Sequence, residues 1–296
     1  MSSLSDCIPW MTVGLVESIA IVTLNLCMIV VFIRNRNLRK RSTYLVINLT
    51  AVDMFVGGSV IYSLFYWSGI RCNLWKWHSI EDGTKTFIEV LMVLFPVASL
   101  TNISVIALER VHATFFPFRH RVLKKWVLQL IITVVWVFSG LLATADRLLL
   151  KFKETHYYGA SVLPTASLIY LMIICSSCTS VVIKVRYKAQ PHHGAVSRER
   201  KLTMTLLIVS AVSLLLYLPH VFWISVGYFS KYEIWWSLPP SLFWHLDNAF
   251  LFLLYANSLV NPILYAIRLP EYRSGVYALF RERPQQQRLL VPLRDM

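Results

Sequence analysis

Seven apolar stretches, each long enough to cross a lipid bilayer, dominate this chain and restrict what it can fold into. A membrane-spanning helix needs about 20 predominantly apolar residues. Hydrophobic residues make up 56% of the sequence and charged residues only 15%, which is typical of a bundle of membrane helices and not of a soluble domain. The windows are residues 10–33, 43–68, 84–112, 126–145, 161–186, 202–229 and 241–267. We therefore predict an all-α membrane protein with seven transmembrane helices.

The distribution of basic residues predicts the orientation of the chain in the membrane. When the connectors are taken alternately, one side carries 7 of the 29 Lys and Arg residues and the other side carries the rest. The richer side should face the cytoplasm. Residues 1–9 then form an extracellular N-terminus, 10–267 the transmembrane domain, 268–281 a short amphipathic cytoplasmic helix, and 282–296 a cytoplasmic tail. The net charge of +14 predicts contacts with anionic membrane lipids and does not indicate nucleic-acid binding.

Two of the five cysteines, Cys7 and Cys72, fall on the outer, oxidising side of the predicted membrane. A disulfide bond between them suits that compartment. Their spacing alone does not bring them together, so an unpaired state stays open. Cys27, Cys175 and Cys178 fall inside predicted helices, where each is most simply a buried small apolar residue.

Several predicted helices carry a polar or charged residue that the interior of a membrane disfavours. Asp53 lies inside the second helix, where its carboxylate should bind a cation, hold a proton or meet a partner. Glu109 and Arg110 stand side by side near the end of the third helix. They indicate a functional site, or, more simply, an arginine that reaches to the membrane interface. Pro262 lies inside the seventh helix, where neighbours or water must satisfy the freed carbonyl groups.

Six features stand in the order found in rhodopsin-like (class A) G-protein-coupled receptors, which the sequence resembles over nearly its whole length. They are Asn25, residues 49–53, Glu109-Arg110-Val111 in place of Asp-Arg-Tyr, Trp136, Tyr217-Leu218-Pro219 in place of Trp-x-Pro, and the run from Asn261 to Tyr265. The resemblance implies a plasma-membrane receptor and not an enzyme. Such a receptor binds an extracellular ligand and activates a heterotrimeric G protein through outward movement of helix six.

The resemblance also implies a switch at the cytoplasmic end of the helices. In the inactive state, Arg110 would be held by Glu109 and by Glu199, which precedes helix-six Pro219 at the distance where the family places its acid. The alternative for Glu199 is a solvated partner of its arginine neighbours. The other residues that the resemblance assigns to the switch and to G-protein coupling are Pro117, Phe118, Asn261, Pro262 and Tyr265.

A second implied site lies in mid-membrane. The family encloses a sodium ion between helices two, three and seven, and the matching residues here are Asp53, Ser99, Asn257, Ser258 and Asn261. A carboxylate with hydroxyl and amide oxygens suits that ion. The alternative is a water-filled hydrogen-bond network at the same place. The resemblance implies no other cofactor.

Departures from the family pattern bear on the ligand. Lys85 stands where the family has an outer cysteine, and residues 147–159 contain no cysteine, so the usual disulfide over the pocket is absent. Tyr217 replaces the tryptophan under the pocket. Met92 stands where amine receptors carry an aspartate, which disfavours a biogenic amine. Tyr255 stands where opsins carry a lysine, which excludes covalently bound retinal.

The predicted ligand pocket is apolar and aromatic with a few polar groups, which is typical of a small-molecule site. Its predicted lining is Glu89, Met92, Pro96, Tyr217, His220, Val221, Ile224, Asp247, Leu251 and Tyr255. Glu89 and Asp247 either receive a cationic or peptide group or stand in water at the outer interface. The ligand can therefore be a small molecule, a lipid or a peptide.

Two other classes of protein must be weighed against a receptor. A secondary transporter could use Asp53 as an intramembrane ion or proton site, although such proteins show repeated halves that this sequence lacks. An intramembrane enzyme would need a nucleophile facing a base, or a set of metal ligands, and we find neither pattern in the sequence.

Overall fold

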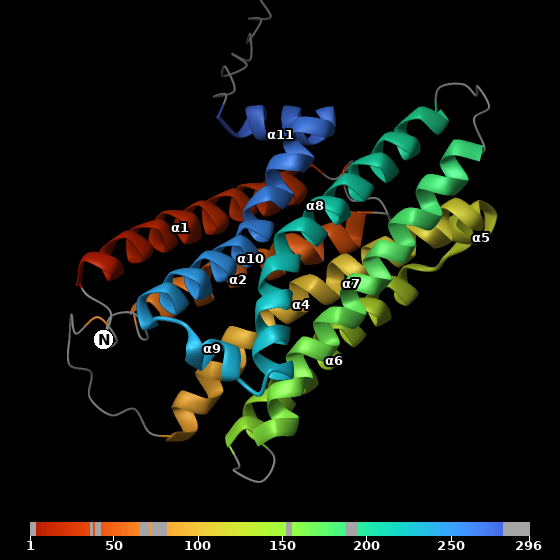
Figure 1. The fold of residues 1–296 in the computed structure, drawn as a ribbon. Coiled ribbons are helices and arrows are strands. Elements are labelled where there is room, and N and C mark those ends of the chain that lie inside the picture. The colour runs from red at the N-terminus through yellow and green to blue at the C-terminus, as the bar shows by residue number, and fades with distance from the viewer. Residues whose placement is uncertain are drawn as a thin grey trace, which may run out of the picture.

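The computed structural model describes residues 4–35, 38, 43–65, 72, 82–151, 156–187 and 195–280, which fold into a bundle of long helices (Figure 1). The helices are α1 (Leu4–Arg34), α2 (Tyr44–Ser63), α4 (Asp82–Phe115), α5 (Pro117–Val122), α6 (Lys125–Lys151), α7 (His156–Tyr187), α8 (Ala195–Phe229), α9 (Glu233–Ser237), α10 (Pro240–Arg268) and α11 (Pro270–Phe280). Seven of them are long and apolar enough to cross a membrane, which confirms the predicted fold class.

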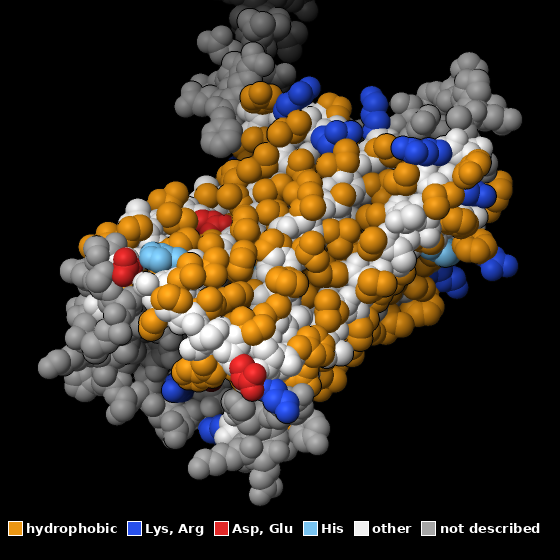
Figure 2. All heavy atoms as spheres, in the orientation of Figure 1, with side chains coloured by type: hydrophobic (Ala, Val, Ile, Leu, Met, Phe, Trp, Pro, Cys, Tyr) orange, Lys and Arg blue, Asp and Glu red, His pale blue; other side chains and the backbone are white. Residues whose placement is uncertain are grey.

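The bundle buries several polar side chains within its hydrophobic core and exposes many large apolar side chains on its outside. Asn25, Asp53 and Asn261 are at most 2% exposed, whereas Met172 and Leu215 expose about 70% of their surface. Figure 2 shows hydrophobic side chains covering one flank of the bundle, with Lys and Arg gathered towards the ends. Large apolar side chains exposed along helices long enough to cross a bilayer are the surface expected of a protein that faces lipid.

Helix α4 forms the centre of the bundle because it packs against α2, α6, α7 and α8. Helix α10 packs against α8, α1 and α2. Residues that the sequence analysis assigned to switch, network and pocket lie mainly on α4, α8 and α10. The network and pocket residues on these helices therefore face the interior of the bundle, and the switch residues lie nearer one end of it.

Helix α6 continues beyond its predicted end at residue 145 and reaches Lys151. The apolar window ended there because Asp146 and Arg147 introduce two charges. In the structure the Arg147 Nη2 atom lies 2.6 Å from Asp146 Oδ2, and Asp146 is only 2% exposed. Because the two charges offset each other, the helix can carry them inside its last turns.

Other boundaries also differ from the prediction. Helix α1 begins at Leu4, so residues 4–9, which we assigned to the extracellular N-terminus, are helical. Two predicted connectors contain short helices, α5 and α9. Pro117 starts α5, where proline suits the first helical turn because it has no amide hydrogen to leave unpaired. At six and five residues, these segments are too short to be recognised as spanning helices.

Cys7 and Cys72 are joined by a disulfide, with their Cα atoms 6.1 Å apart. The bond connects α1 to the segment that follows α2. Beside it, Trp10 of α1 donates its ring hydrogen to His245 Nδ1 of α10 at 2.9 Å. Helices α1 and α10 and the segment that contains Cys72 are therefore linked at this end of the bundle.

Helix α11 lies across the other end of the bundle, where it packs against α1 and α10 (Figure 1). The Tyr272 ring meets Phe32 of α1 edge to face at 5.2 Å. A Cβ atom added to Gly275 would stand 2.6 Å from Val31, so the glycine permits this close approach. Tyr277 is 68% exposed, as expected for the outer face of an amphipathic helix.

Candidate functional site

The carboxylate of Asp53, which is completely buried in α2, joins three helices. Ser99 of α4 and Ser258 of α10 each donate a hydroxyl hydrogen to Asp53 Oδ1 at 2.7 Å. Asn261 of α10 donates from Nδ2 to Asp53 Oδ2 at 2.8 Å. Four of the five residues assigned to a sodium or water network therefore form one hydrogen-bonded group, and the fifth, Asn257, is buried one turn before Asn261.

Two further residues that match the family pattern connect neighbouring helices to this group. Asn25 Nδ2 donates to the Ser258 carbonyl oxygen at 3.0 Å and so ties α1 to α10. Trp136 Nε1 donates to Asn48 Oδ1 at 3.0 Å and ties α6 to α2. These bonds hold the backbone around Asp53 in a fixed register.

A cavity of about 490 Å³ opens between α4, α6, α7, α8 and α10, on the side of Asp53 that faces α9. Every predicted lining residue except Asp247 borders it. Asp247 instead accepts a hydrogen bond from Trp223 Nε1 at 3.0 Å, and Trp223 belongs to an aromatic cluster with Trp235 and Phe243. The volume lies in the range of small-molecule sites.

Part of the cavity wall was not predicted. Asp146 and Arg147 line it from the extended end of α6, and Tyr232 and Trp235 line it from the α9 segment. The adjacent acid and base after an apolar run were the only sequence signal for the first pair. The second pair lies in a connector, and a connector has no helical periodicity from which to predict the direction of its side chains.

Tyr217 connects the floor of the cavity to the Asp53 network. Its side chain is 2% exposed and its hydroxyl lies 3.5 Å from the Pro96 carbonyl oxygen of α4. Pro96 lies three residues before Ser99 on α4. The tyrosine that replaces the family's tryptophan thus lines the cavity and packs beside the part of α4 that carries Ser99 of the network.

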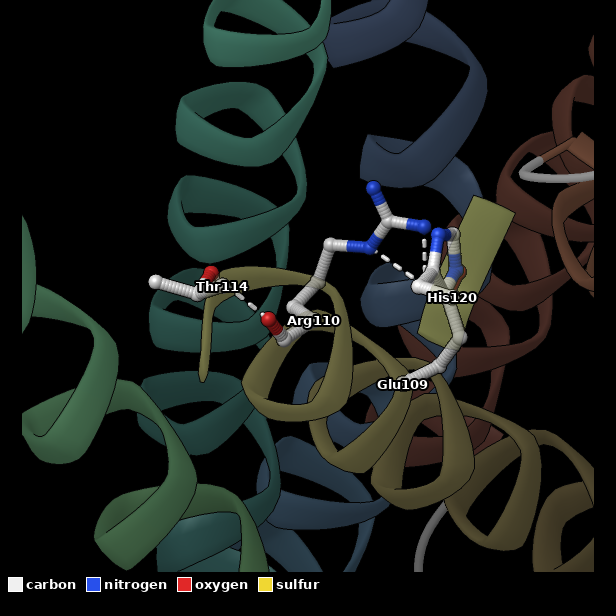
Figure 3. Close-up of polar contacts among 4 residues, drawn as sticks. All are labelled: Glu109, Arg110, Thr114 and His120. Atoms are coloured by element: carbon white, nitrogen blue, oxygen red, sulfur yellow. Dashed lines mark hydrogen bonds and ion pairs between the residues drawn. The ribbon is translucent and has the colours of Figure 1, made fainter. Parts of the chain in front are cut away.

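Arg110 is buried at the opposite end of α4, where its guanidinium lies against the Glu109 carboxylate (Figure 3). Arg110 donates from Nε to Glu109 Oε2, and its Nη2 atom forms an ion pair with the same oxygen. The other carboxylate oxygen, Oε1, lies 2.6 Å from Nε2 of His120 in α5. Glu109 therefore holds Arg110 with one oxygen and α5 with the other. The sequence analysis did not identify His120, since a histidine in a basic connector resembles a solvated one.

The α5 segment displays aromatic side chains beside this pair. Phe118 is 81% exposed and Phe116 is 53% exposed. Phe115, at the end of α4, has the Lys184 ammonium 5.4 Å from its ring centre. Exposed aromatic groups next to a polar membrane surface are typical of an interaction surface.

Three of the remaining switch residues, Asn261, Pro262 and Tyr265, are buried on α10, and Asn261 belongs to the Asp53 network. Tyr265 packs near Tyr272 of α11, with ring centres 6.3 Å apart. The side chain of Glu199 lies outside the described part of the structure, so its pairing with Arg110 stays a prediction.

Comparisons with known proteins agree with this arrangement. Residues 24–265 match the family described as 7 transmembrane receptor (rhodopsin family). The chain is 26% identical to the histamine H2 receptor of Canis lupus familiaris over 283 residues, which covers 84% of this chain and 73% of that receptor. It is also 26% identical to the histamine H2 receptor of Homo sapiens over 273 residues, covering 83% and 72% of the two chains.

Proposed function

The chain belongs to the rhodopsin family of seven-transmembrane receptors, and on this premise we propose that it is a plasma-membrane receptor that activates a heterotrimeric G protein. The ligand binds in the cavity from the extracellular side, and the N-terminus lies outside the cell, as the positive-inside rule predicts. Binding favours a state in which α8 moves outward about Pro219 and uncovers a cytoplasmic cleft beside Arg110.

The burial of Arg110 against Glu109 is the observation that carries this proposal. Arg110 is 4% exposed, and a buried guanidinium at a membrane boundary is costly unless it pairs or performs a function. The pair lies next to the exposed aromatic side chains of α5, where a cytoplasmic partner can dock. A partner that attracts Arg110 away from Glu109 would stabilise the open state.

The ligand proposed here is a small molecule other than a biogenic amine. The relatives are named for histamine, but Met92 occupies the position at which amine receptors carry an aspartate, and it lines the cavity. A thioether cannot neutralise an ammonium group. The relatives therefore support the receptor class and not the identity of the ligand.

We include an allosteric sodium ion in the proposal because the residues around Asp53 fit one. The two hydroxyl oxygens of Ser99 and Ser258 converge on a single carboxylate oxygen, each at 2.7 Å. Together these residues form a set of hard oxygen ligands around a negative charge, which suits an alkali cation and not a soft metal. The ion would neutralise the buried carboxylate when bound.

The sodium proposal is tested by melting the purified receptor in sodium chloride and in choline chloride at equal ionic strength. We expect a higher melting temperature in sodium for the wild type and no difference for Asp53→Asn, because ligands that bind only the folded state stabilise it. Identical melting temperatures of the wild type in the two salts would refute the ion and leave a water network.

The receptor proposal is tested by coexpression with a panel of G-protein biosensors. We expect basal or lipid-extract-evoked signalling that disappears in Arg110→Ala and persists in Lys125→Ala, which removes an exposed cation at the same end of the bundle. Surface expression is measured for each variant. Signalling that survives in Arg110→Ala contradicts the proposal, and solute flux that requires Asp53 but not Arg110 would instead identify a transporter.

A further inference from the structure

We propose that the cavity binds an anionic amphiphile, a ligand with one apolar chain and a carboxylate or phosphate head. This inference rests on the proposed receptor function only in taking the cavity as the ligand site. It specifies the chemical class of the ligand, which neither the family nor the relatives provide.

The cavity is elongated and mainly apolar along its length. Glu89 and Leu100 both line it from α4, and eleven residues of helix separate them by about 16 Å along the helix axis. Between these two levels the wall is aliphatic and aromatic, and it includes Val93, Val97 and Leu254. A linear apolar chain can fill such a space and release water from its walls, which is the main source of affinity in apolar sites.

The outer end of the cavity is polar and basic. A second, smaller cavity of about 200 Å³ adjoins the first and shares Glu89, Arg147 and Leu150 with it. Its other lining residues are Lys85, Thr86 and Lys151, and the Lys151 ammonium lies 3.3 Å from the Thr86 hydroxyl. Basic side chains from α4 and α6 therefore surround the place where the apolar cavity ends.

The sign of the charge at this end selects the head group. The described lining of the two cavities contains the cations Lys85, Arg147 and Lys151 and the carboxylates of Glu89 and Asp146. Asp146 is already paired with Arg147 at 2.6 Å. The Lys151 ammonium contacts the neutral Thr86 hydroxyl. An ammonium head would be repelled by Lys151, whereas a carboxylate or phosphate would accept hydrogen bonds from it and from the other basic groups.

The chain of such a ligand would end near the residue that connects the cavity to the rest of the receptor. Tyr217 and Leu100 line the deep end, and the Tyr217 hydroxyl lies 3.5 Å from the carbonyl oxygen of Pro96, three residues before Ser99 of the Asp53 network. A ligand long enough to press on Tyr217 can therefore act on the network. The head supplies orientation, and the chain supplies the contact with α8.

The experiment measures melting of the full-length receptor in nanodiscs of neutral phosphatidylcholine with four probes that share a ten-carbon chain. The probes are decanoate, decyl phosphate, decanol and decylamine. We expect decanoate or decyl phosphate to raise the melting temperature saturably. The anion with the lower half-saturating concentration identifies the head as carboxylate or phosphate. Equal stabilisation by decanol or decylamine overturns the proposal, as does no stabilisation by either anion.

Variants of the basic end provide the second arm. In the double variant Lys85→Gln, Lys151→Gln we expect the half-saturating concentration to rise by about tenfold or more, because hydrogen bonds to charged groups are lost. The matched control is Lys231→Gln, which lies outside both cavities, and Lys85→Arg with Lys151→Arg should restore binding. If the double variant is unfolded without ligand, Lys151→Gln alone is used. Unchanged binding in a folded variant overturns the proposal.

Binding and signalling are read separately, so the two proposals can fail independently. Saturable, lysine-dependent stabilisation by an anionic probe without any G-protein response would support the ligand class and contradict the proposed signalling. Signalling that requires Arg110, together with no stabilisation by either anion, would contradict the ligand class and leave the receptor function in place.

Discussion

The Asp53 network makes a quantitative prediction for receptor stability. Replacing Asp53 by Ala removes all three hydrogen bonds that join α2 to α4 and α10. Hydrogen bonds between membrane helices contribute on average about 0.6 kcal/mol and at most about 1.7 kcal/mol. The loss is therefore roughly 2 to 5 kcal/mol, which corresponds to a fall in melting temperature of roughly 4 to 20 °C for a chain of this size.

Asp53→Asn should cost much less than Asp53→Ala. The asparagine keeps an oxygen at the Oδ1 position, which accepts the bonds from Ser99 and Ser258, and only the bond from Asn261 meets a nitrogen instead. Rotation of the Asn261 amide presents its oxygen to that nitrogen. The expected loss is thus no more than about one hydrogen bond, or roughly 1 to 7 °C.

The measurement is a melting curve of each purified variant in choline chloride, where sodium cannot contribute. Thr179→Ala is the control, because it removes a hydrogen bond within one helix, to the Cys175 carbonyl oxygen, at a position exposed on the outside of the bundle. It should melt close to the wild type. If Asp53→Ala and Asp53→Asn melt at the same temperature, the hydrogen bonds do not join the helices as described.

Two further predictions concern the ends of the bundle. His120→Phe removes the contact with Glu109 and should raise basal G-protein biosensor output about fivefold per surface receptor, as a net loss of about 1 kcal/mol implies. His120→Gln retains a hydrogen-bond donor and should leave the basal output unchanged. Equal output from the two variants would contradict the role of His120 in holding Glu109. Gly227→Ala places a Cβ atom against the Trp235 ring and should lower the melting temperature by several degrees. Gly58→Ala, whose Cβ atom would meet nothing within 4 Å, should melt like the wild type. Equal melting temperatures of the two variants would show that α9 can move away from Gly227 without loss of stability.

The spanning helices and the central polar residues could be predicted from the sequence because the bilayer imposes a simple rule. An apolar run must be long enough to cross the bilayer, and a polar residue inside that run must have a binding partner or a functional role. That rule singled out Asp53, and the family resemblance placed Asn261 in the same network, where their hydrogen bond is present in the structure. The resemblance likewise implied the pocket, and its residues on α4, α8 and α10 line the cavity, with the exception of Asp247.

The parts that were not predicted depend on contacts between segments. Asp146 and Arg147 neutralise each other inside α6, so hydropathy alone ended the helix too early. Asp247 lies on α10, which lines the cavity, but its carboxylate accepts a hydrogen bond from Trp223 of α8 and does not line the cavity. His120 acquires its role only because α5 folds back against the end of α4.

The contact between His120 and Glu109 makes α5 part of the environment of Arg110. A molecule that binds Phe118 therefore acts next to the carboxylate that restrains the arginine. On the proposed function, a binder of α5 that prefers the released arginine raises the affinity of the cavity for an agonist. By thermodynamic linkage, the agonist raises the affinity for that binder by the same factor. An antibody fragment against α5 with this preference would thus be an agonist-like modulator that acts from the proposed cytoplasmic side.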